Sequence, residues 1–118
     1  MKIEGKAGML KIYTGETDKV HGKPLYEAII FEARKAGMAG ATAYQGVMSF
    51  GASHSVHALK IFSLSDKLPI IIEIVDSVEK LDSFAERVNE LMDLSRKGGL
   101  VLFQEVDIVR YQSGEKYR

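Results

Sequence analysis

One run of aliphatic residues constrains the fold more than any other feature of the chain. Ile70 to Val75 has the sequence IIIEIV and is preceded by Pro69. A run this short and this apolar is typical of a strand in the middle of a sheet, covered on both faces or nearly so. Pro69 suits the first position of such a strand, which tolerates a residue without an N–H. The run therefore predicts a buried central strand.

Two amphipathic helices are predicted around this strand. Apolar residues recur at helical spacings from Leu25 to Ala36, and again from Val78 to Met92. Asp76 is expected to cap the second helix, with Glu79 closing a capping box. Each helix would bury one apolar stripe against a sheet.

Strand patterns fill the segments on either side of these helices. They are Gly8–Thr14, Ala41–Val47 and Leu100–Tyr111. After a polar loop at Gly15–Lys23 and a second loop at Met48–Ser55, Val56–Leu64 is expected to return as a hairpin partner.

The resulting order is strand, helix, strand, hairpin excursion, strand, helix, strand. It predicts one α+β domain over residues 1–118, a ferredoxin-like βαββαβ sandwich with an extra hairpin between its second and third strands. One face of such a sheet has no helices, so we expect subunits to associate through their sheets.

The composition excludes several classes of protein. Lys+Arg and Asp+Glu both number 16, so no net positive field attracts nucleic acid. The absence of cysteine removes disulfides and thiolate metal sites. No apolar run is long enough to cross a bilayer, and the N-terminus does not resemble a signal peptide. A cytoplasmic protein is expected that does not bind nucleic acid and does not itself insert into a membrane.

Three histidines are the obvious candidates for catalysis or metal binding. His54 and His57 lie three residues apart in the central segment, and His21 lies in the first loop. No acid or cysteine stands close to His54 and His57 in the sequence, so solvated loop side chains are favoured over a metal site. No serine has the setting of a nucleophile. The sequence therefore predicts a protein that is not an enzyme.

Glycines beside cations form a second set of candidates. The glycines are Gly46, Gly51, Gly98 and Gly99. Glycine lets backbone N–H groups approach a phosphate, although a turn explains each one singly. Arg96 and Lys97 precede one glycine pair, and Arg110 ends the last predicted strand. Cations beside glycine loops suit a phosphate group.

Several segments resemble PII signalling proteins. GMAGATAYQGVMSFG (37–51) is similar to their second strand and loop entrance, and LPIIIEIVD (68–76) to their third strand. GGLVLFQEVDIVRYQSGE (98–115) resembles their last strand and C-terminal loop. IYTGETDKVHGKPLYE (12–27) is closer to an uncharacterised PII-like branch. The resemblance covers nearly the whole chain.

This resemblance implies a homotrimer that holds ATP or ADP in clefts between its subunits, with a mobile central loop that contacts a partner. Thr42 matches a threonine near the adenine, and Phe50 and Gly51 match the Phe-Gly that enters the loop. Gly98 matches a glycine of the phosphate-facing loop, and Arg110 the first of two C-terminal arginines.

The sequence departs from the PII pattern at several positions. Gln112 replaces the second arginine, and Ile70 replaces a lysine of the third strand. Gly99 takes the place of the phosphate-loop lysine, although Lys97 is adjacent. Tyr44 precedes the central loop, where no modifiable tyrosine matches. These changes imply a rearranged set of phosphate contacts.

The leading hypothesis is a regulatory trimer that binds an adenine nucleotide, ADP or ATP, with or without Mg²⁺. A transporter or an enzyme would be the target of its loop. Two alternatives keep the same scaffold. One is a metal or small-anion sensor that uses His21, His54 and His57, and the other is a slow phosphohydrolase.

Overall fold

The computed structural model describes residue 3 and residues 5–50, 56–58 and 68–114. Within these ranges the chain forms eight strands and two helices. In chain order they are β1 (Ala7–Gly15), β2 (Lys19–Val20), β3 (Lys23–Pro24), α1 (Leu25–Lys35), β4 (Gly40–Gln45), β5 (Met48–Phe50), β6 (Val56–Ala58), β7 (Pro69–Ser77), α2 (Val78–Ser95) and β8 (Leu100–Val106).

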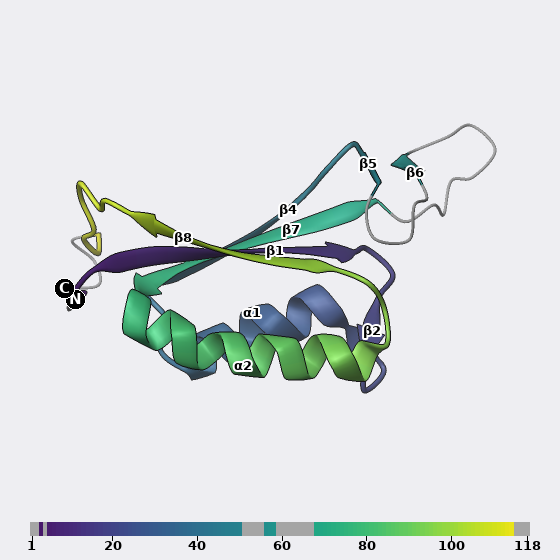
Figure 1. The fold of residues 1–118 in the computed structure, drawn as a ribbon, viewed down its shortest axis with the longest axis horizontal. Helices are drawn as coiled ribbons and strands as arrows, with labels where there is room; N and C mark the ends of the chain where they lie inside the picture. Colours follow the sequence, from purple (N-terminus) through teal and green to yellow (C-terminus); the bar gives the residue numbers. More distant parts are fainter. Residues whose placement is uncertain (1–2, 4, 51–55, 59–67, 115–118) are drawn as a thin grey trace.

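Four strands form one antiparallel sheet in the order β4-β7-β1-β8. The central strands β1 and β7 each lead into a helix, and the outer strands β4 and β8 each follow one. Both helices lie on the same face of the sheet (Figure 1). This is the ferredoxin-like arrangement, so the predicted α+β fold class is confirmed.

The core lies between the sheet and the two helices. Ile12 of β1 and Ile72 of β7 are directly opposite one another and fully buried. Each helix adds an apolar stripe, and the stripes consist of Leu25, Ile29 and Ala33 from α1 and Leu81, Phe84, Val88, Leu91 and Met92 from α2. No helix within the described ranges is long and apolar enough to span a lipid bilayer. The aliphatic run of β7 thus forms the centre of the core, as the sequence predicts.

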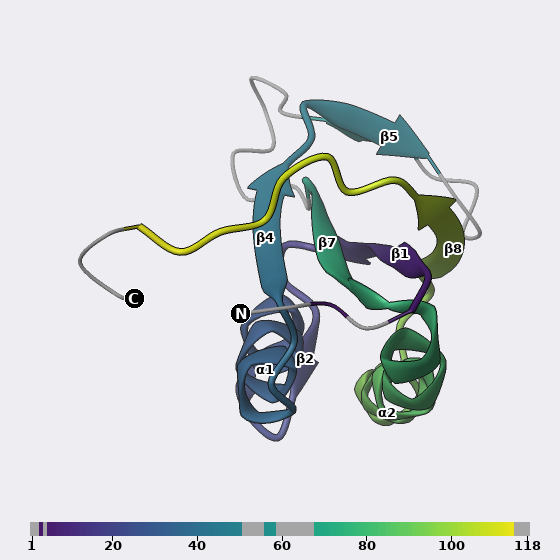
Figure 2. The same cartoon turned by 90° about the vertical axis from the view of Figure 1, so that its left-hand side faces the viewer.

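The opposite face of the sheet is open. Among the described elements, no helix covers it (Figure 2). Because side chains alternate along a strand, Lys11 and Tyr13 of β1 point to this face and are only partly buried. By register, Leu100 and Leu102 of β8 lie on the same face, and they remain 50% and 44% exposed. We call this surface the open face.

Several element boundaries differ from the prediction. The segment predicted as a loop from Met48 begins with β5, which pairs with β6. The polar loop Gly15–Lys23 contains a small hairpin of β2 and β3, turned at His21 and Gly22 with positive φ angles of 51° and 76°. The last strand ends at Val106 rather than continuing to Tyr111. These short elements lack the long periodic patterns by which strands are recognised.

The corner between β7 and α2 corrects another prediction. Ser77, not Asp76, is the N-cap of α2, and its hydroxyl accepts a hydrogen bond from the Lys80 N–H at 3.2 Å. The capping box of Asp76 with Glu79 is therefore wrong. The Asp76 carboxylate instead accepts hydrogen bonds from the N–H groups of Ala39 at 2.8 Å and Ser77 at 2.6 Å. It also lies 3.3 Å from Lys80 Nζ.

Asp76 thus ties this corner to the residues that lead into β4. Burial opposes ionisation of its carboxyl group, but the two N–H donors and the Lys80 ammonium outweigh burial and lower the pKa of Asp76. A carboxylate whose pKa is lower in the folded state stabilises the fold above its unfolded pKa. That stabilisation is lost as the pH falls through the folded value.

Replacing Asp76 by Asn should lower the free energy of unfolding by about 2 kcal/mol at neutral pH, because a neutral amide cannot satisfy these donors equally. The difference between the free energies of unfolding of the variant and the wild type should narrow below about pH 4. There the carboxyl group is protonated in the unfolded wild type, and the folded protein loses the stabilisation by the carboxylate as the pH falls further. Urea unfolding at fixed protein concentration measures both effects. Asp82→Asn, which changes an exposed carboxylate of α2, is the matched control. Equal stability of Asp76→Asn and wild type at neutral pH would contradict this role.

Candidate functional site

The strand register brings two predicted glycine positions to the same end of the sheet. Gln45, the last residue of β4, pairs with Ile70 of β7, and Ile70 pairs with Thr14 of β1. Tyr13 in turn pairs with Leu100, the first residue of β8. The residues that follow β4 and those that precede β8 therefore lie at one end of the sheet. They are on its two outer edges, with β7 and β1 between them.

Gly46 occupies a tight position directly after β4. Its N–H donates a hydrogen bond to the Pro69 carbonyl at 2.8 Å. A Cβ atom at this position would lie 2.7 Å from Pro69 Cγ. Packing against Pro69 therefore already requires glycine here, whether or not a ligand binds.

The turn between α2 and β8 holds four predicted phosphate-binding residues, Arg96, Lys97, Gly98 and Gly99. Arg96 ends α2 in the left-handed conformation, with φ 62°, and its N–H donates to the Met92 and Asp93 carbonyls. A Cβ atom on Gly99 would lie 2.8 Å from the Tyr13 carbonyl oxygen. The backbone of this turn is thus packed closely against the end of β1. Lys97 and Gly98 remain exposed.

The other predicted site residues are distributed over the β4 edge. Thr42 is exposed on β4, opposite Glu73 of β7. Phe50 lies on β5 and is 73% exposed. Gly51 lies outside the described residues. Thr42, which was predicted to contact the base, lies in β4, and Gly46 directly follows this strand. Both residues are therefore on the same outer edge of the sheet.

Arg110 lies at the opposite end of the sheet. The segment after β8 crosses toward β4 (Figure 2), and the Tyr111 hydroxyl donates to the Ala39 carbonyl at 2.8 Å. Ala39 directly precedes β4, whereas Gly46 follows it. One chain therefore does not bring Arg110 together with the turn between α2 and β8.

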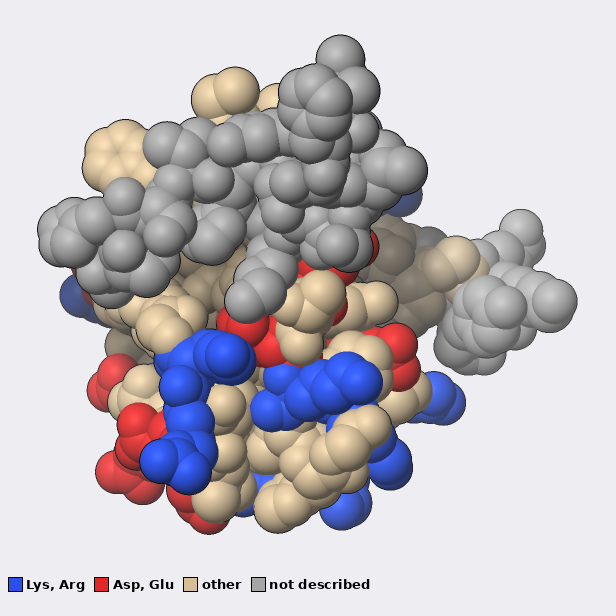
Figure 3. All heavy atoms as spheres, turned by 90° about the vertical axis from the view of Figure 1, so that its right-hand side faces the viewer, with Lys and Arg blue, Asp and Glu red and all other residues tan. Residues whose placement is uncertain are grey.

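A feature that the sequence analysis missed lies beside that turn. The β2–β3 hairpin carries Lys19 and Lys23, both exposed, and β2 packs against α2. Figure 3 shows two groups of Lys and Arg side chains in the middle of this end of the molecule, with uncharged surface and some Asp and Glu side chains next to them. The sequence signal for this hairpin was the pattern KVHGK, in which the dipeptide His-Gly, typical of a turn, stands between two lysines.

A polar cluster occupies the middle of the open face. The Tyr44 hydroxyl donates to Glu73 Oε2 at 2.7 Å, and Lys11 Nζ lies 3.7 Å from the same oxygen. The hydrogen bond to Glu73 raises the pKa of Tyr44. The phenol groups of Tyr13 and Tyr44, together with the Glu73 carboxylate, raise the pKa of Lys11. The strands β1, β4 and β7 thus contribute one side chain each to a hydrogen-bonded ionic network, on a surface that is otherwise largely apolar.

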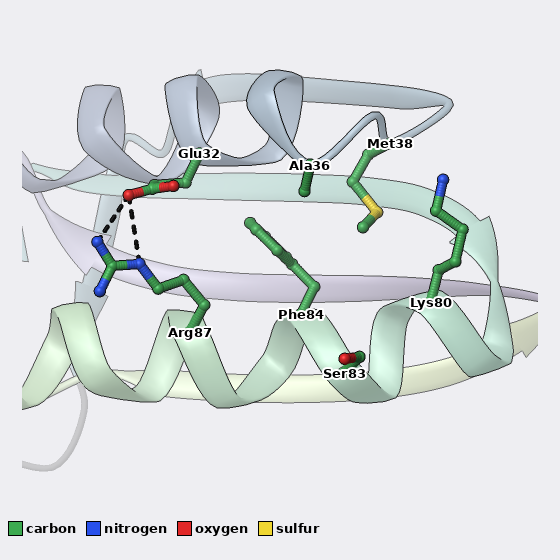
Figure 4. Close-up of a pocket in the computed structure, with 7 residues that line it drawn as sticks. All are labelled: Glu32, Ala36, Met38, Lys80, Ser83, Phe84 and Arg87. Atoms are coloured by element: carbon green, nitrogen blue, oxygen red, sulfur yellow. Dashed lines mark hydrogen bonds and ion pairs between the residues drawn. The ribbon is translucent and has the colours of Figure 1, made fainter.

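Two hollows lie elsewhere in the described structure. A groove of about 330 Å³ between α1 and α2 (Figure 4) is lined by Glu32, Ala36, Met38, Lys80, Ser83, Phe84 and Arg87. Arg87 Nη2 is 2.7 Å from Glu32 Oε1, so an ion pair joins the two helices there. The second hollow, of about 380 Å³, lies between the N-terminal segment and the segment after β8. Neither hollow is lined by a predicted site residue.

The predicted histidine site is not assembled in the part of the chain that the structure describes. His21 is exposed in the β2–β3 turn, His57 lies in β6, and His54 is outside the described residues. Over the described ranges, no three His, Asp or Glu side chains come together as a metal site. The metal-sensor alternative stays a prediction.

Comparison with known sequences assigns a family. Residues 7–108 match the model of the DUF190 family, described as "Uncharacterized ACR". A UPF0166 protein of Methanocaldococcus jannaschii is 34% identical over 112 residues, which are 95% of this chain and 97% of that protein. A UPF0166 protein of Aquifex aeolicus is 29% identical over 104 residues, 88% of this chain and 94% of that protein.

Comparison with solved structures finds the same architecture. CPII, a nitrogen regulatory PII-like protein from Thiomonas intermedia K12, was solved with ADP, AMP and bicarbonate bound. It has a TM-score of 0.65 at 19% identity, over 90% of this chain and 91% of that chain. The divalent ion tolerance protein CutA1 from Ehrlichia chaffeensis has a TM-score of 0.56 at 9% identity, over 97% and 90%. At these identities the likeness is one of fold. Taken with the family match, it shows that the chain belongs to the DUF190 (UPF0166) family and has a PII-like fold.

Proposed function

We propose that this single-domain protein is a cytoplasmic regulator that binds ADP or ATP in clefts between the subunits of a homotrimer. The observation that carries the proposal is the placement of the predicted cations. Lys97 lies at one end of the sheet and Arg110 at the other, so a site that uses both needs a second subunit. The PII-like fold of CPII, which was solved with ADP and AMP, supports this class of ligand. The role is binding rather than catalysis.

Each predicted residue has a role in this proposal. Arg96 and Lys97 neutralise phosphates, and the exposed backbone at Gly98 and Gly99 approaches them. Arg110 is supplied by the neighbouring subunit. Thr42 bonds the base, and Gly46, Phe50 and Gly51 form the entrance to the central loop. Mg²⁺, where present, accompanies the phosphates.

The open face supports the assembly. Leu100 and Leu102 on β8 and Tyr44 on β4 are large side chains exposed on this face. Their burial between subunits would stabilise the trimer by the hydrophobic effect. The network of Tyr44, Glu73 and Lys11 is already hydrogen-bonded within one chain, so it can be covered without leaving an unpaired charge.

The segment around β5 supports a surface for a partner. Val47, Met48 and Phe50 are all strongly exposed apolar residues. β5 and β6 form a hairpin that projects beyond the sheet (Figure 1). Exposed apolar side chains gathered in one place are typical of protein interaction sites. We propose a transporter or an enzyme as the partner, with nucleotide occupancy controlling its binding.

Titration calorimetry with ATP, ADP and AMP tests the nucleotide site. We expect saturable binding to the wild type, and about tenfold weaker binding to Arg110→Gln, because the variant loses a charge-assisted contact. Arg34→Gln, which changes an exposed arginine in the last turn of α1, is the matched control and should bind as the wild type does. Absence of heat with all three nucleotides at millimolar concentration would overturn the nucleotide function.

Mixed trimers test whether the site is shared between subunits. Lys97→Gln and Arg110→Gln subunits, each weakened alone, are unfolded together and refolded as a mixture. If Lys97 and Arg110 come from different subunits, some clefts in the mixture regain both residues and wild-type affinity. If both residues acted from the same chain, mixing would restore none, and the two homotrimers refolded separately provide the baseline.

Light scattering after size exclusion tests the assembly. Leu102→Glu should convert the trimer to a monomer, because it buries an additional charge in the interface. The monomer should still fold, since Leu102 lies opposite Lys11 and the new carboxylate meets a cation there. Phe31→Glu, at a residue 58% exposed on α1, is the control that should leave the assembly intact. A trimeric Leu102→Glu protein would rule out the open face as the interface.

A further inference from the structure

The β2–β3 hairpin is a short element with a firm base. Val20 is buried in the core next to α2. The Asp18 side-chain carboxylate accepts a hydrogen bond from the Gly15 N–H at 2.8 Å. The backbone carbonyl of Asp18 accepts one from the Leu25 N–H at 2.8 Å. These contacts fix the hairpin between the end of β1 and the start of α1. Its two lysines, by contrast, are exposed to solvent.

Two observations place these lysines beside the turn between α2 and β8. Gly15 ends β1, and Tyr13 of the same strand pairs with Leu100, directly after that turn. β2 also packs against α2. Lys19, Lys23, Arg96 and Lys97 therefore lie at one end of the molecule. Lys and Arg side chains gather on the end of the molecule that Figure 3 shows.

Among the residues that the structure describes, no carboxylate forms an ion pair with any of these four cations. Within the described ranges, the ion pairs involve Lys6, Lys11, Lys80 and Arg87, and none involves these four residues. The carboxylates of the adjacent turn form no ion pair with them either, since Asp18 accepts from the Gly15 N–H and Glu16 from Gln45 Nε2 at 2.8 Å. A concentration of unpaired cations on two rigidly placed elements attracts a multiply charged anion.

We propose that Lys19 and Lys23 form, with Arg96 and Lys97, a binding site for a polyphosphate chain. The inference rests on the proposed nucleotide function, to which it adds the di- or triphosphate as the part of the ligand that this end of the molecule recognises. Four cations exceed what one phosphate group needs, so the site favours ATP and ADP over AMP. The β2–β3 hairpin thereby takes over contacts that the PII-like pattern assigns to residues replaced here by Ile70 and Gln112.

Calorimetry with sodium tripolyphosphate tests the site without the nucleoside. The Lys19→Gln/Lys23→Gln double variant should bind tripolyphosphate at least about tenfold more weakly than the wild type, since each charge-assisted contact contributes strongly. Its affinity should also depend less steeply on salt concentration than that of the wild type. The matched control is Arg34→Gln/Lys35→Gln, which removes two exposed cations from the last turn of α1 and should change neither quantity. Circular dichroism and the single variants check that the double variant is folded.

The outcomes separate this inference from the nucleotide function. Lysine-dependent binding of tripolyphosphate without binding of any adenine nucleotide would support this site and overturn the nucleotide function. ATP and tripolyphosphate binding that is equal in the wild type and in Lys19→Gln/Lys23→Gln would overturn this site and leave the nucleotide function standing. Equal weakening in the control pair would also overturn it, because the effect would then be one of net charge. If the wild type bound neither tripolyphosphate nor nucleotide, both would fail.

Discussion

Ile12 of β1 lies opposite Ile72 of β7 beneath the helices, while the neighbouring pair, Lys11 and Glu73, points to the open face. A shift of one residue between the two central strands would turn the side chains of one strand over, so that either Glu73 or Lys11 would enter the core unpaired and the aliphatic side chains of that strand would face outward. The register is therefore strongly fixed. β4 pairs with β7 and β8 pairs with β1, so both outer strands are built onto these two central strands.

The two faces of this sheet then take different parts in the molecule. One face packs against the two helices, and aliphatic side chains fill the space between them. The other combines large apolar side chains such as Leu102 with a cross-strand network of Tyr44, Glu73 and Lys11. Such a face is stable in water because its charges are paired within the chain, yet it offers apolar area to other copies. Assembly through this face would leave both helices and the two ends of the sheet accessible.

The residues that we propose as ligand contacts lie at the two ends of the sheet. At one end, the turn at Lys97 and the β2–β3 hairpin bring cations close to a tightly packed backbone. At the other end, the segment with Arg110 is held near the start of β4 by the hydrogen bond from Tyr111 to Ala39. A ligand that needs both ends must lie between two chains. In the proposed function, nucleotide binding and assembly would therefore be linked, so that a change in one alters the other.

The order of strands and helices, the central aliphatic strand and the face that each helix buries were predictable from the sequence, because long periodic patterns determine them. The glycine pair at Gly98 and Gly99 likewise predicted the end of the second helix. Shorter features were decided only by tertiary contacts. Ser77 rather than Asp76 caps α2, because the Asp76 carboxylate is drawn to the Ala39 N–H from a distant segment. The gathering of cations at one end, and the separation of Arg110 from them, follow from strand register, which no local pattern contains.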